Sequence, residues 1–135
     1  MGTQIGAGGV RQVILVVEDE AQILKLYTRR LTAEGFLVLQ AKDGASGLSE
    51  ALSNRPDLIL LDINMPGMSG FEMLRRLRTT NDYGSRVPTI FLTNLEIANK
   101  TAEKDIIGVE PADYLIKSNL DLDDLVSKVR KHLAE

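Results

Sequence analysis

The segment Leu58-Ile59-Leu60-Leu61-Asp62 is a short run of apolar residues that ends in a carboxylate. An unbroken apolar run of this length indicates a strand that is buried on both faces, as in a parallel sheet. The chain contains four further runs of strand length. Three of them also end in a polar residue: residues 13–17 before Glu18 and Asp19, 89–92 before Thr93, and 114–116 before Lys117. The fourth run, residues 37–39, has no such ending.

Segments with helical periodicity separate these runs. Apolar residues recur at helical spacing over residues 20–34, 44–54, 69 to about 80, 95 to about 108, and 121–133. Ser69 is a predicted N-cap and Gly35 a predicted helix stop. Strands that alternate with helices in this way predict an α/β domain whose parallel sheet is covered on both faces. Of the doubly wound arrangements, the five-stranded order 2-1-3-4-5 suits this length, and its binding crevice lies between the carboxyl ends of the first and third strands.

Length and composition restrict the classes of protein. The 135 residues carry a formal net charge of −3, which argues against a strongly basic surface for nucleic acid. Cysteine is absent, which excludes disulfides and thiolate metal sites. No apolar stretch approaches the ~20 residues that span a bilayer. No signal-peptide pattern opens the sequence, so we expect a cytoplasmic location without membrane contact.

The first ten residues differ in composition from the rest of the chain. They are small, polar and glycine-rich, so we expect residues 1–10 to be a disordered leader or a remnant of the expression vector. Their glycines precede the first strand, whereas the glycines of a nucleotide-binding loop follow a strand and open a helix. We therefore expect one domain over residues 11–135.

The polar residues at the strand ends are the candidate functional residues. On the predicted strand order, Glu18, Asp19 and Asp62 converge in one crevice. Three crowded carboxylates raise pKa values or destabilise the fold unless a cation lies among them, and Mg²⁺ is the hard, oxygen-binding cation that suits such a site. A carboxylate can attack phosphorus to give an aspartyl-phosphate. The cation and Lys117 would then neutralise charge on the transferred group.

Each of these residues also has an ordinary structural explanation. Asp19 alone is better explained as the N-cap of the following helix, and Thr93 could cap the next one. Lys117 could be a surface lysine, and Asp62 could begin a turn. These explanations do not account for the convergence of all four residues at one edge of the sheet.

Over residues 13–133, the sequence resembles the receiver domain of two-component response regulators. The resemblance rests on Val-Glu-Asp-Glu at 17–20, Leu-Asp-Ile-Asn-Met-Pro-Gly-Met-Ser-Gly at 61–70, Thr93, and Ala-Asp-Tyr-Leu-Ile-Lys at 112–117. It implies the flavodoxin-like (βα)5 fold. It also implies that Asp62 accepts a phosphoryl group from a phosphohistidine of a sensor histidine kinase or a phosphotransfer protein. The chain would then be no enzyme beyond Mg²⁺-dependent self-phosphorylation and self-dephosphorylation.

The same resemblance assigns roles to the neighbours of Asp62. It implies that Asp19 and Asp62 ligate Mg²⁺ together with the backbone carbonyl of Asn64, and that Glu18 holds a metal-bound water. Asn64 and Leu95 occupy positions that tune the lifetime of the phosphate. Because the apolar Leu95 cannot orient an attacking water by hydrogen bonding, we expect slow self-dephosphorylation.

The resemblance also implies a conformational switch. Thr93 would be the switch hydroxyl, Lys117 the cation that pairs with the phosphoryl group, and Tyr114 the switch aromatic. Taken alone, Tyr114 is more simply a half-buried aromatic on an edge strand. The switch would reshape the face of the helix over 95–108, the strand over 114–116 and the last helix. That face would contact an output target or a second copy in a homodimer, and we expect no direct DNA binding by this chain.

Two departures from the family pattern keep alternatives open. Asn94 stands where the family usually has alanine, glycine or serine, and Ser118 where it usually has proline. A receiver-like interaction module that is not phosphorylated is therefore one alternative. A phosphatase with an aspartyl nucleophile is another, although Asn64 cannot supply the general acid that this chemistry requires two positions after the nucleophile.

Overall fold

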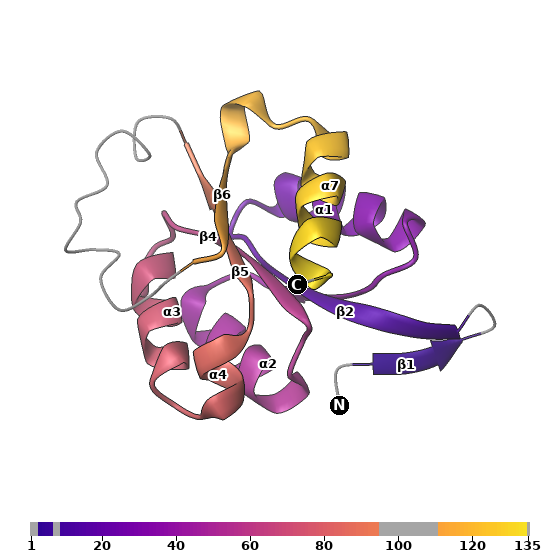
Figure 1. Ribbon diagram of the computed structural model, residues 1–135. Helices are drawn as coiled ribbons and strands as arrows, with labels where there is room; N and C mark the ends of the chain where they lie inside the picture. Colours follow the sequence, from indigo (N-terminus) through magenta and orange to yellow (C-terminus); the bar gives the residue numbers. More distant parts are fainter. Residues whose placement is uncertain (1–2, 7–8, 95–110, 135) are drawn as a thin grey trace.

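The structure is a computed structural model that describes residues 3–6, 9–94 and 111–134 (Figure 1). The described elements are, in chain order, β1 (Thr3–Gly6), β2 (Gly9–Val17), α1 (Ala21–Ala33), β3 (Leu37–Ala41), α2 (Gly44–Asn54), β4 (Leu58–Asp62), α3 (Gly70–Arg78), α4 (Asp82–Arg86), β5 (Thr89–Thr93), β6 (Asp113–Ile116), the short 3-10 helix η1 (Lys117–Asn119) and α7 (Leu122–Leu133). The helix expected over residues 95–108 lies outside the described residues.

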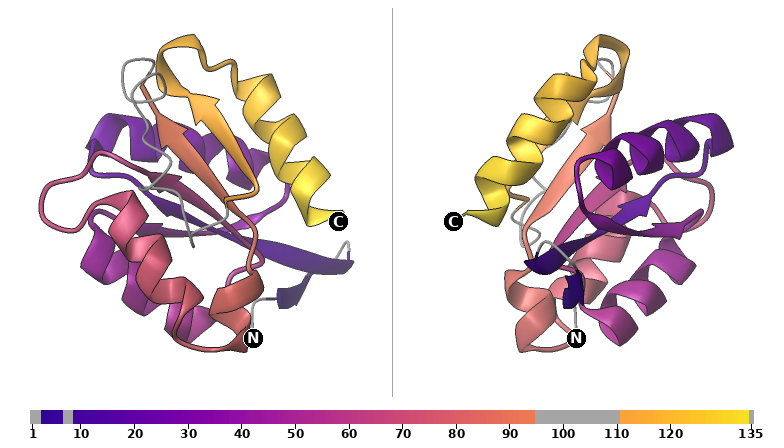
Figure 2. Two further views of the ribbon diagram at one scale, coloured as in Figure 1. Left: turned by 60° about the vertical axis from the view of Figure 1, so that its left-hand side comes forward. Right: turned by 90° about the vertical axis from the view of Figure 1, so that its right-hand side faces the viewer.

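The central sheet is parallel and doubly wound. Its strand order is β3-β2-β4-β5-β6, which confirms the predicted order 2-1-3-4-5. The register pairs Val17 with Leu61, and Asp62 with Leu92, so these strands end at nearly the same level. Helices α1 and α7 cover one face of the sheet, and α2, α3 and α4 cover the other (Figures 1 and 2).

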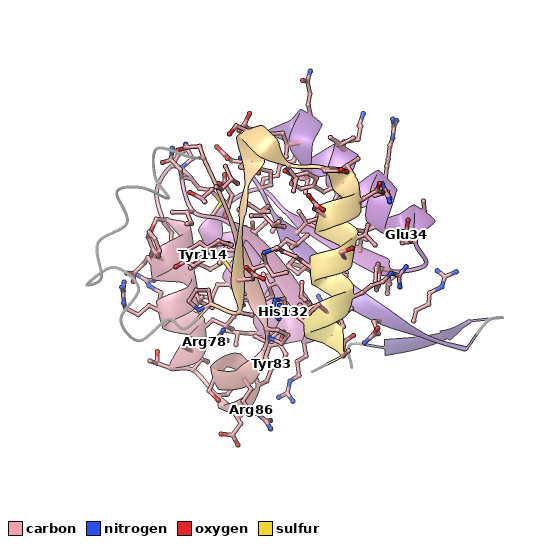
Figure 3. The ribbon with its side chains drawn as sticks, turned by 45° about the horizontal axis from the view of Figure 1, so that its top comes forward. Glu34, Arg78, Tyr83, Arg86, Tyr114 and His132 are labelled. Carbon is pink, nitrogen blue, oxygen red and sulfur yellow. The ribbon has the colours of Figure 1, made fainter. Side chains whose placement is uncertain are left out.

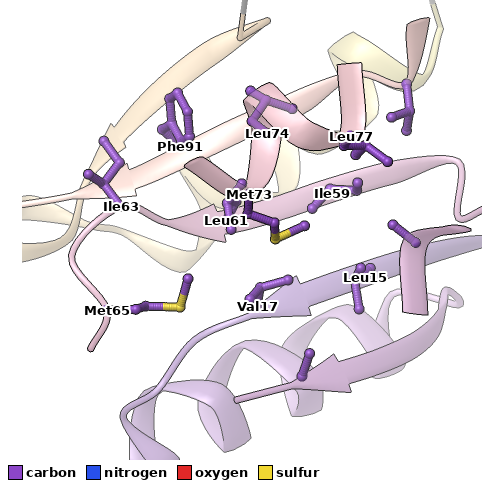
Figure 4. Close-up of a cluster of buried hydrophobic side chains, with 13 residues drawn as sticks. Leu15, Val17, Ile59, Leu61, Ile63, Met65, Met73, Leu74, Leu77 and Phe91 are labelled. Atoms are coloured by element: carbon purple, nitrogen blue, oxygen red, sulfur yellow. The ribbon is translucent and has the colours of Figure 1, made fainter. Parts of the chain in front are cut away.

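Each face of the sheet has its own apolar core, because alternate side chains of a strand point to opposite faces. Every residue of β4 and β5 is buried, which explains why these strands lack polar alternation. The core beneath α2 and α3 is shown in Figure 4 and includes Leu15, Val17, Ile59, Leu61, Met73, Leu74, Leu77 and Phe91. The core beneath α1 and α7 includes Ile14, Val16, Leu24, Tyr27, Leu31, Leu60, Ile90, Leu125 and Val129.

The helix ends follow local hydrogen-bonding rules. The hydroxyl of Ser69 accepts a hydrogen bond from the backbone N–H of Glu72 at 3.2 Å, which confirms the predicted N-cap of α3. Gly35 follows α1 with φ +101°, a conformation that favours glycine, and confirms the predicted helix stop. The capping explanation of Asp19 is wrong: the N-cap of α1 is Glu20, and it makes no side-chain cap hydrogen bond.

Two elements were not predicted from the sequence. Residues 3–6, within the expected leader, form β1, antiparallel to the first part of β2, and the pair extends beyond the parallel sheet (Figures 1 and 2). Only two residues separate β1 from β2, a spacing typical of hairpins that the glycine-rich composition obscured. Helix α4 was not predicted, because its five residues are too few to show a helical period. No described helix has the length and apolar character to cross a bilayer.

Candidate functional site

The candidate site lies at the carboxyl edge of the parallel sheet. Asp62 and Thr93 are the last residues of β4 and β5, and Glu18 and Lys117 directly follow β2 and β6. Glu18, Asp62 and Thr93 are 0%, 2% and 1% exposed. Because the strands are parallel and in register, four segments that are far apart in sequence meet at this edge.

Three carboxylates converge at the site. Glu18, Asp19 and Asp62 each offer an oxygen, and these oxygens lie within 4.8 Å of one another. Asp19 is exposed, whereas Glu18 is held in place: its Oε2 accepts a hydrogen bond from the backbone N–H of Glu20 at 3.0 Å. All the side-chain ligands are carboxylate oxygens, so the donor set fits a hard divalent cation such as Mg²⁺.

Lys117 is the cation that the fold itself supplies to this cluster. Its Nζ lies 2.9 Å from Oε1 of Glu18 and 3.6 Å from Oδ2 of Asp62. It also donates a hydrogen bond to Oε1 of Glu20 at 3.2 Å. Burial disfavours the charged ammonium, but the hydrogen bonds to Glu18 and Glu20 and the charges of Asp62 and Glu18 outweigh burial and raise the pKa of Lys117. Lys117 therefore remains charged beside the carboxylates.

One ammonium does not balance the carboxylates around Asp62. Burial raises the pKa of Asp62 to about 8, and the charge of Glu18 contributes to the rise. Lys117 and the backbone N–H of Asn64, which donates to Oδ1 of Asp62 at 3.3 Å, act in the opposite direction. The ionised form of Asp62, which is the nucleophilic form, therefore needs more positive charge than Lys117 provides.

The loop that follows Asp62 depends on a glycine that sequence reasoning did not single out. The backbone N–H of Gly70, the first residue of α3, donates to the carbonyl of Ile63 at 2.9 Å. A Cβ at this position would overlap the backbone oxygen of Asp62. Only a glycine lets α3 begin this close to the end of β4. The signal was present in the sequence, because Gly70 ends the decapeptide over residues 61–70 that carries the family resemblance.

The cluster opens into a pocket of ≈ 510 Å³, which is lined by Asp19, Glu20, Ile23, Asp62, Asn64, Asn94, Lys117 and Ser118. The two positions at which the sequence departs from the family pattern, Asn94 and Ser118, are therefore both at the pocket. The peptide bond between Lys117 and Ser118 is trans, as are the other peptide bonds of the described residues. From its position in η1, Lys117 reaches both Glu18 and Asp62.

Neither Thr93 nor Tyr114 lines this pocket. The hydroxyl of Thr93 donates to the backbone oxygen of Asn94 at 3.2 Å. Tyr114 lies on β6 (Figure 3), half-buried, with its ring centroid 5.6 Å from that of Phe91. Phe91 in turn packs edge-on against Phe71 of α3 at 5.1 Å. Tyr114 therefore packs against the core beneath α3. Leu95, the other residue with a predicted role near the site, lies outside the described residues.

Comparison with known proteins places this geometry in context. The family model described as the response regulator receiver domain matches residues 14–130. The chain is 38% identical over 127 residues to the DNA-binding response regulator MtrA of Mycobacterium tuberculosis, an alignment that covers 92% of this chain and 51% of MtrA. It is 37% identical over 123 residues to the uncharacterized transcriptional regulatory protein YkoG of Bacillus subtilis, covering 90% of this chain and 51% of YkoG. The chain thus spans about half the length of these curated relatives.

Solved structures with the same fold include the chemotaxis protein CheY4 of Vibrio cholerae, with a TM-score of 0.80 and 26% identity over 90% of this chain and 98% of CheY4. They also include the receiver domain of the sensor histidine kinase PA1611 of Pseudomonas aeruginosa, with a TM-score of 0.82 and 27% identity over 93% of this chain and 99% of that domain. The PA1611 structure has a magnesium ion coordinated in its active-site cleft.

Proposed function

Since this chain belongs to the receiver domains of response regulators, we propose that its Asp62 accepts a phosphoryl group from a sensor histidine kinase or a phosphotransfer protein. One observation carries the proposal: a buried aspartate ends a central strand, shares a cluster with Glu18 and Asp19, and faces the ammonium of Lys117 at 3.6 Å. This arrangement suits a carboxylate nucleophile whose product is a more negative group in the same place.

The residues that would hold Mg²⁺ are Asp19 and Asp62 through their carboxylates, Asn64 through its backbone carbonyl, and Glu18 through a metal-bound water. Support comes from the oxygen-only donor set within 4.8 Å and from the magnesium ion in the PA1611 receiver domain. When bound, Mg²⁺ would offset the charge of the carboxylates and of the phosphoryl oxygens. The raised pKa of Asp62 is the physical reason that the site needs it.

In the transfer step, a carboxylate oxygen of Asp62 attacks the phosphorus of the phosphohistidine. The P–N bond breaks, and its electron pair stays on the imidazole nitrogen, which then takes up a proton. Lys117 is placed to pair with an oxygen of the transferred group, because its Nζ lies beside Asp62. The exposed Glu20, which now accepts a hydrogen bond from Lys117, is the contact that this pairing would replace.

The proposed switch begins at Thr93. Its hydroxyl would leave the backbone oxygen of Asn94 and donate to the new phosphoryl oxygens. The space that Thr93 vacates would admit the ring of Tyr114, which already packs against Phe91. This movement would change the surface around β6 and α7, where an output target or a second copy of the chain would bind. Asn64 and Leu95 would tune the lifetime of the phosphate.

Phosphorylation can be tested with acetyl phosphate and Mg²⁺. We expect the wild type to gain one acid-stable, base-labile phosphoryl group, seen by intact mass, and Asp62→Asn to gain none. Asp82→Asn, which changes an exposed aspartate on α4, is the matched control and should behave as wild type. Release of many equivalents of phosphate would instead identify a phosphatase. A wild type that is neither modified nor active would identify an interaction module that is not phosphorylated.

A further inference from the structure

A second pocket lies at the opposite edge of the sheet from Asp62. It has a volume of ≈ 280 Å³ and is lined by Arg55, Pro56, Asp57, Tyr83, Arg86, Val87 and Pro88. Asp57 and Pro88 directly precede β4 and β5, the strands that end in Asp62 and Thr93. We call it the amino-edge pocket. Figure 3 shows Tyr83 and Arg86 on α4, at the far end of the molecule from η1.

The pocket combines an apolar floor with a cationic rim. Pro56 and Val87 are buried, Tyr83 and Pro88 are half-buried, and Arg55 and Arg86 are exposed. The hydroxyl of Tyr83 donates to the backbone oxygen of Pro56 at 2.7 Å, and this hydrogen bond joins α4 to the segment before β4 at the floor. Such a surface suits a ligand with an apolar part beside a negative charge.

The two guanidinium groups at the rim have spare donors. The Nε of Arg86 donates to the backbone oxygen of Asp82 at 3.2 Å, and Arg55 lies over the ring of Tyr83 at 6.0 Å from its centroid. Neither has a carboxylate within ion-pair distance among the residues that the structure describes. Their remaining N–H groups are therefore available to an external oxyanion, for which the arginine fork is well matched.

The backbone conformation of Arg55 is an independent observation that points to a binding role. Arg55 ends α2 with φ 46° and ψ 60°, and it is the only non-glycine residue with positive φ in the described chain. Helices usually end this way with glycine or asparagine, because a Cβ is unfavourable there. An arginine at a position that favours glycine places a charged side chain at the rim at a cost in backbone strain, a pattern found at functional sites.

The charge of Asp57 favours a carboxylate within a peptide over a free phosphate as the ligand of this pocket. Its Oδ2 accepts a hydrogen bond from the backbone N–H of Val13 at 2.7 Å, whereas its Oδ1 accepts none from the described residues. A phosphate dianion would meet the negative charge of Asp57. A peptide carries one charge in each carboxylate and also offers backbone N–H donors to Asp57.

We propose that the amino-edge pocket binds an acidic segment of a partner protein, with a carboxylate between Arg55 and Arg86 and an adjacent apolar side chain over Tyr83. Backbone N–H groups of the segment donate to Asp57. This interaction is separate from phosphorylation at the carboxyl edge, so it does not depend on the function proposed for Asp62.

Amide chemical shifts of the full 135-residue chain provide the test. A blocked glutamate–leucine–glutamate tripeptide is the probe, and the corresponding glutamine–leucine–glutamine tripeptide is its control. We expect saturable shifts at Arg55, Asp57, Tyr83 and Val87 with the acidic peptide and none with the neutral one. Equal binding of both peptides, or no saturable shift, would overturn the proposal. Binding of inorganic phosphate without the acidic peptide would also overturn it, because the pocket would then be a free-anion site.

Two variants separate binding from folding. We expect Arg55→Asn and Arg86→Gln each to weaken the acidic peptide at least tenfold. Because asparagine tolerates positive φ, Arg55→Asn should keep or raise the Tm, whereas a purely structural role of Arg55 predicts a lower Tm. Arg86 ends α4 at an ordinary helical position and tests the rim without this change in strain. Arg29→Gln, an exposed arginine on α1, is the charge-matched control, and an equal loss of binding there would contradict a local site.

Discussion

The acidic residues at the two edges of the parallel sheet differ in how well their negative charge is compensated. At the amino edge, Asp57 accepts a hydrogen bond from the backbone of Val13, and Asp113 is paired with Lys128 at 2.9 Å and with His132 at 3.0 Å. At the carboxyl edge, Glu18, Glu20 and Asp62 all contact Lys117, and Asp19 offers a further carboxylate beside Glu18 and Asp62. Lys117 alone does not balance the negative charge at the carboxyl edge, and this excess of negative charge is the physical basis of the metal and phosphorylation site that we propose at Asp62.

Removal of Lys117 should cause the largest loss of stability, because Lys117 partly neutralises the carboxylates at the carboxyl edge. Lys117→Met leaves Glu18 fully buried without its cation, which for a buried pair costs about 3–5 kcal/mol of unfolding free energy. Urea unfolding without Mg²⁺ measures the loss, and millimolar Mg²⁺ should restore part of it. Lys25→Met, which removes an exposed lysine of α1, should change stability by less than about 0.5 kcal/mol. A loss no larger than this in Lys117→Met would show that the cluster does not depend on Lys117.

A substitution at Gly70 tests the geometry of the same edge without changing its charge. In Gly70→Ala, the new Cβ would overlap the backbone oxygen of Asp62, so α3 and the loop before it must move. We expect a loss of about 2–4 kcal/mol of unfolding free energy together with slower phosphorylation.

Gly35→Ala is the matched control for this comparison. Its Cβ would meet nothing within 4 Å, so its only cost is the positive φ, about 1–2 kcal/mol. Calorimetry of the two variants measures the difference. Equal losses would indicate that the contact of Gly70 with the end of β4 contributes little to stability.

Addition of Mg²⁺ should stabilise the protein through the carboxylates at the carboxyl edge and not through the acidic residues at the amino edge. A cation that binds only the folded state at ten times its dissociation constant stabilises it by about 1.4 kcal/mol. We therefore expect millimolar Mg²⁺ to raise the Tm of the wild type and to raise that of Asp19→Asn much less. Asp121→Asn, which changes the exposed N-cap aspartate of α7, should keep the wild-type response. An equal Mg²⁺ response in Asp19→Asn would exclude Asp19 from the metal site.

The smallest expected change in stability comes from Asp113, the ion-paired aspartate at the amino edge. Burial opposes the ionisation of Asp113, but hydrogen bonds from His132 and Lys128 outweigh it and lower the pKa of Asp113 to about 2. A lowered pKa in the folded state contributes stability above the ordinary aspartate pKa of about 3.8, and this stability is lost as the pH falls toward 2.

This contribution should be about 1 kcal/mol, since the group is partly exposed to solvent. Urea unfolding between pH 2 and 5 measures it, and Asp113→Asn should flatten the pH dependence over that range. The same slope in the variant as in the wild type would mean that Asp113 is not the residue that titrates.

The positions that sequence reasoning predicted well are those with strong local or periodic signals. The all-apolar runs predicted the buried strands, and their alternation with amphipathic segments predicted the strand order that the structure confirms. Ser69 and Gly35 were predictable because caps and helix stops depend on a few adjacent residues. Asp19 was the exception: a capping residue and a site residue look alike until the start of α1 is known.

Other features depend on contacts between distant segments and left no usable local signal. Helix α4 is too short to show a period, and the strained backbone of Arg55 cannot be read from composition. The amino-edge pocket joins the end of α2 to α4 and to the start of β5, segments with no common motif. Gly70 is different, because it stands in the decapeptide that carries the family resemblance; only the reason for a glycine there, the overlap of a side chain with the end of β4, needed the structure.

Hydrophobic periodicity and residue type are local properties, and they were enough to predict the class of fold, the order of the strands and the chemistry available at the strand ends. Folding in three dimensions buries Glu18 against Lys117 while Asp19 stays exposed, and it brings Arg55 and Arg86 to one rim. These outcomes depend on strand register and helix packing, which set distances between residues that are far apart along the chain.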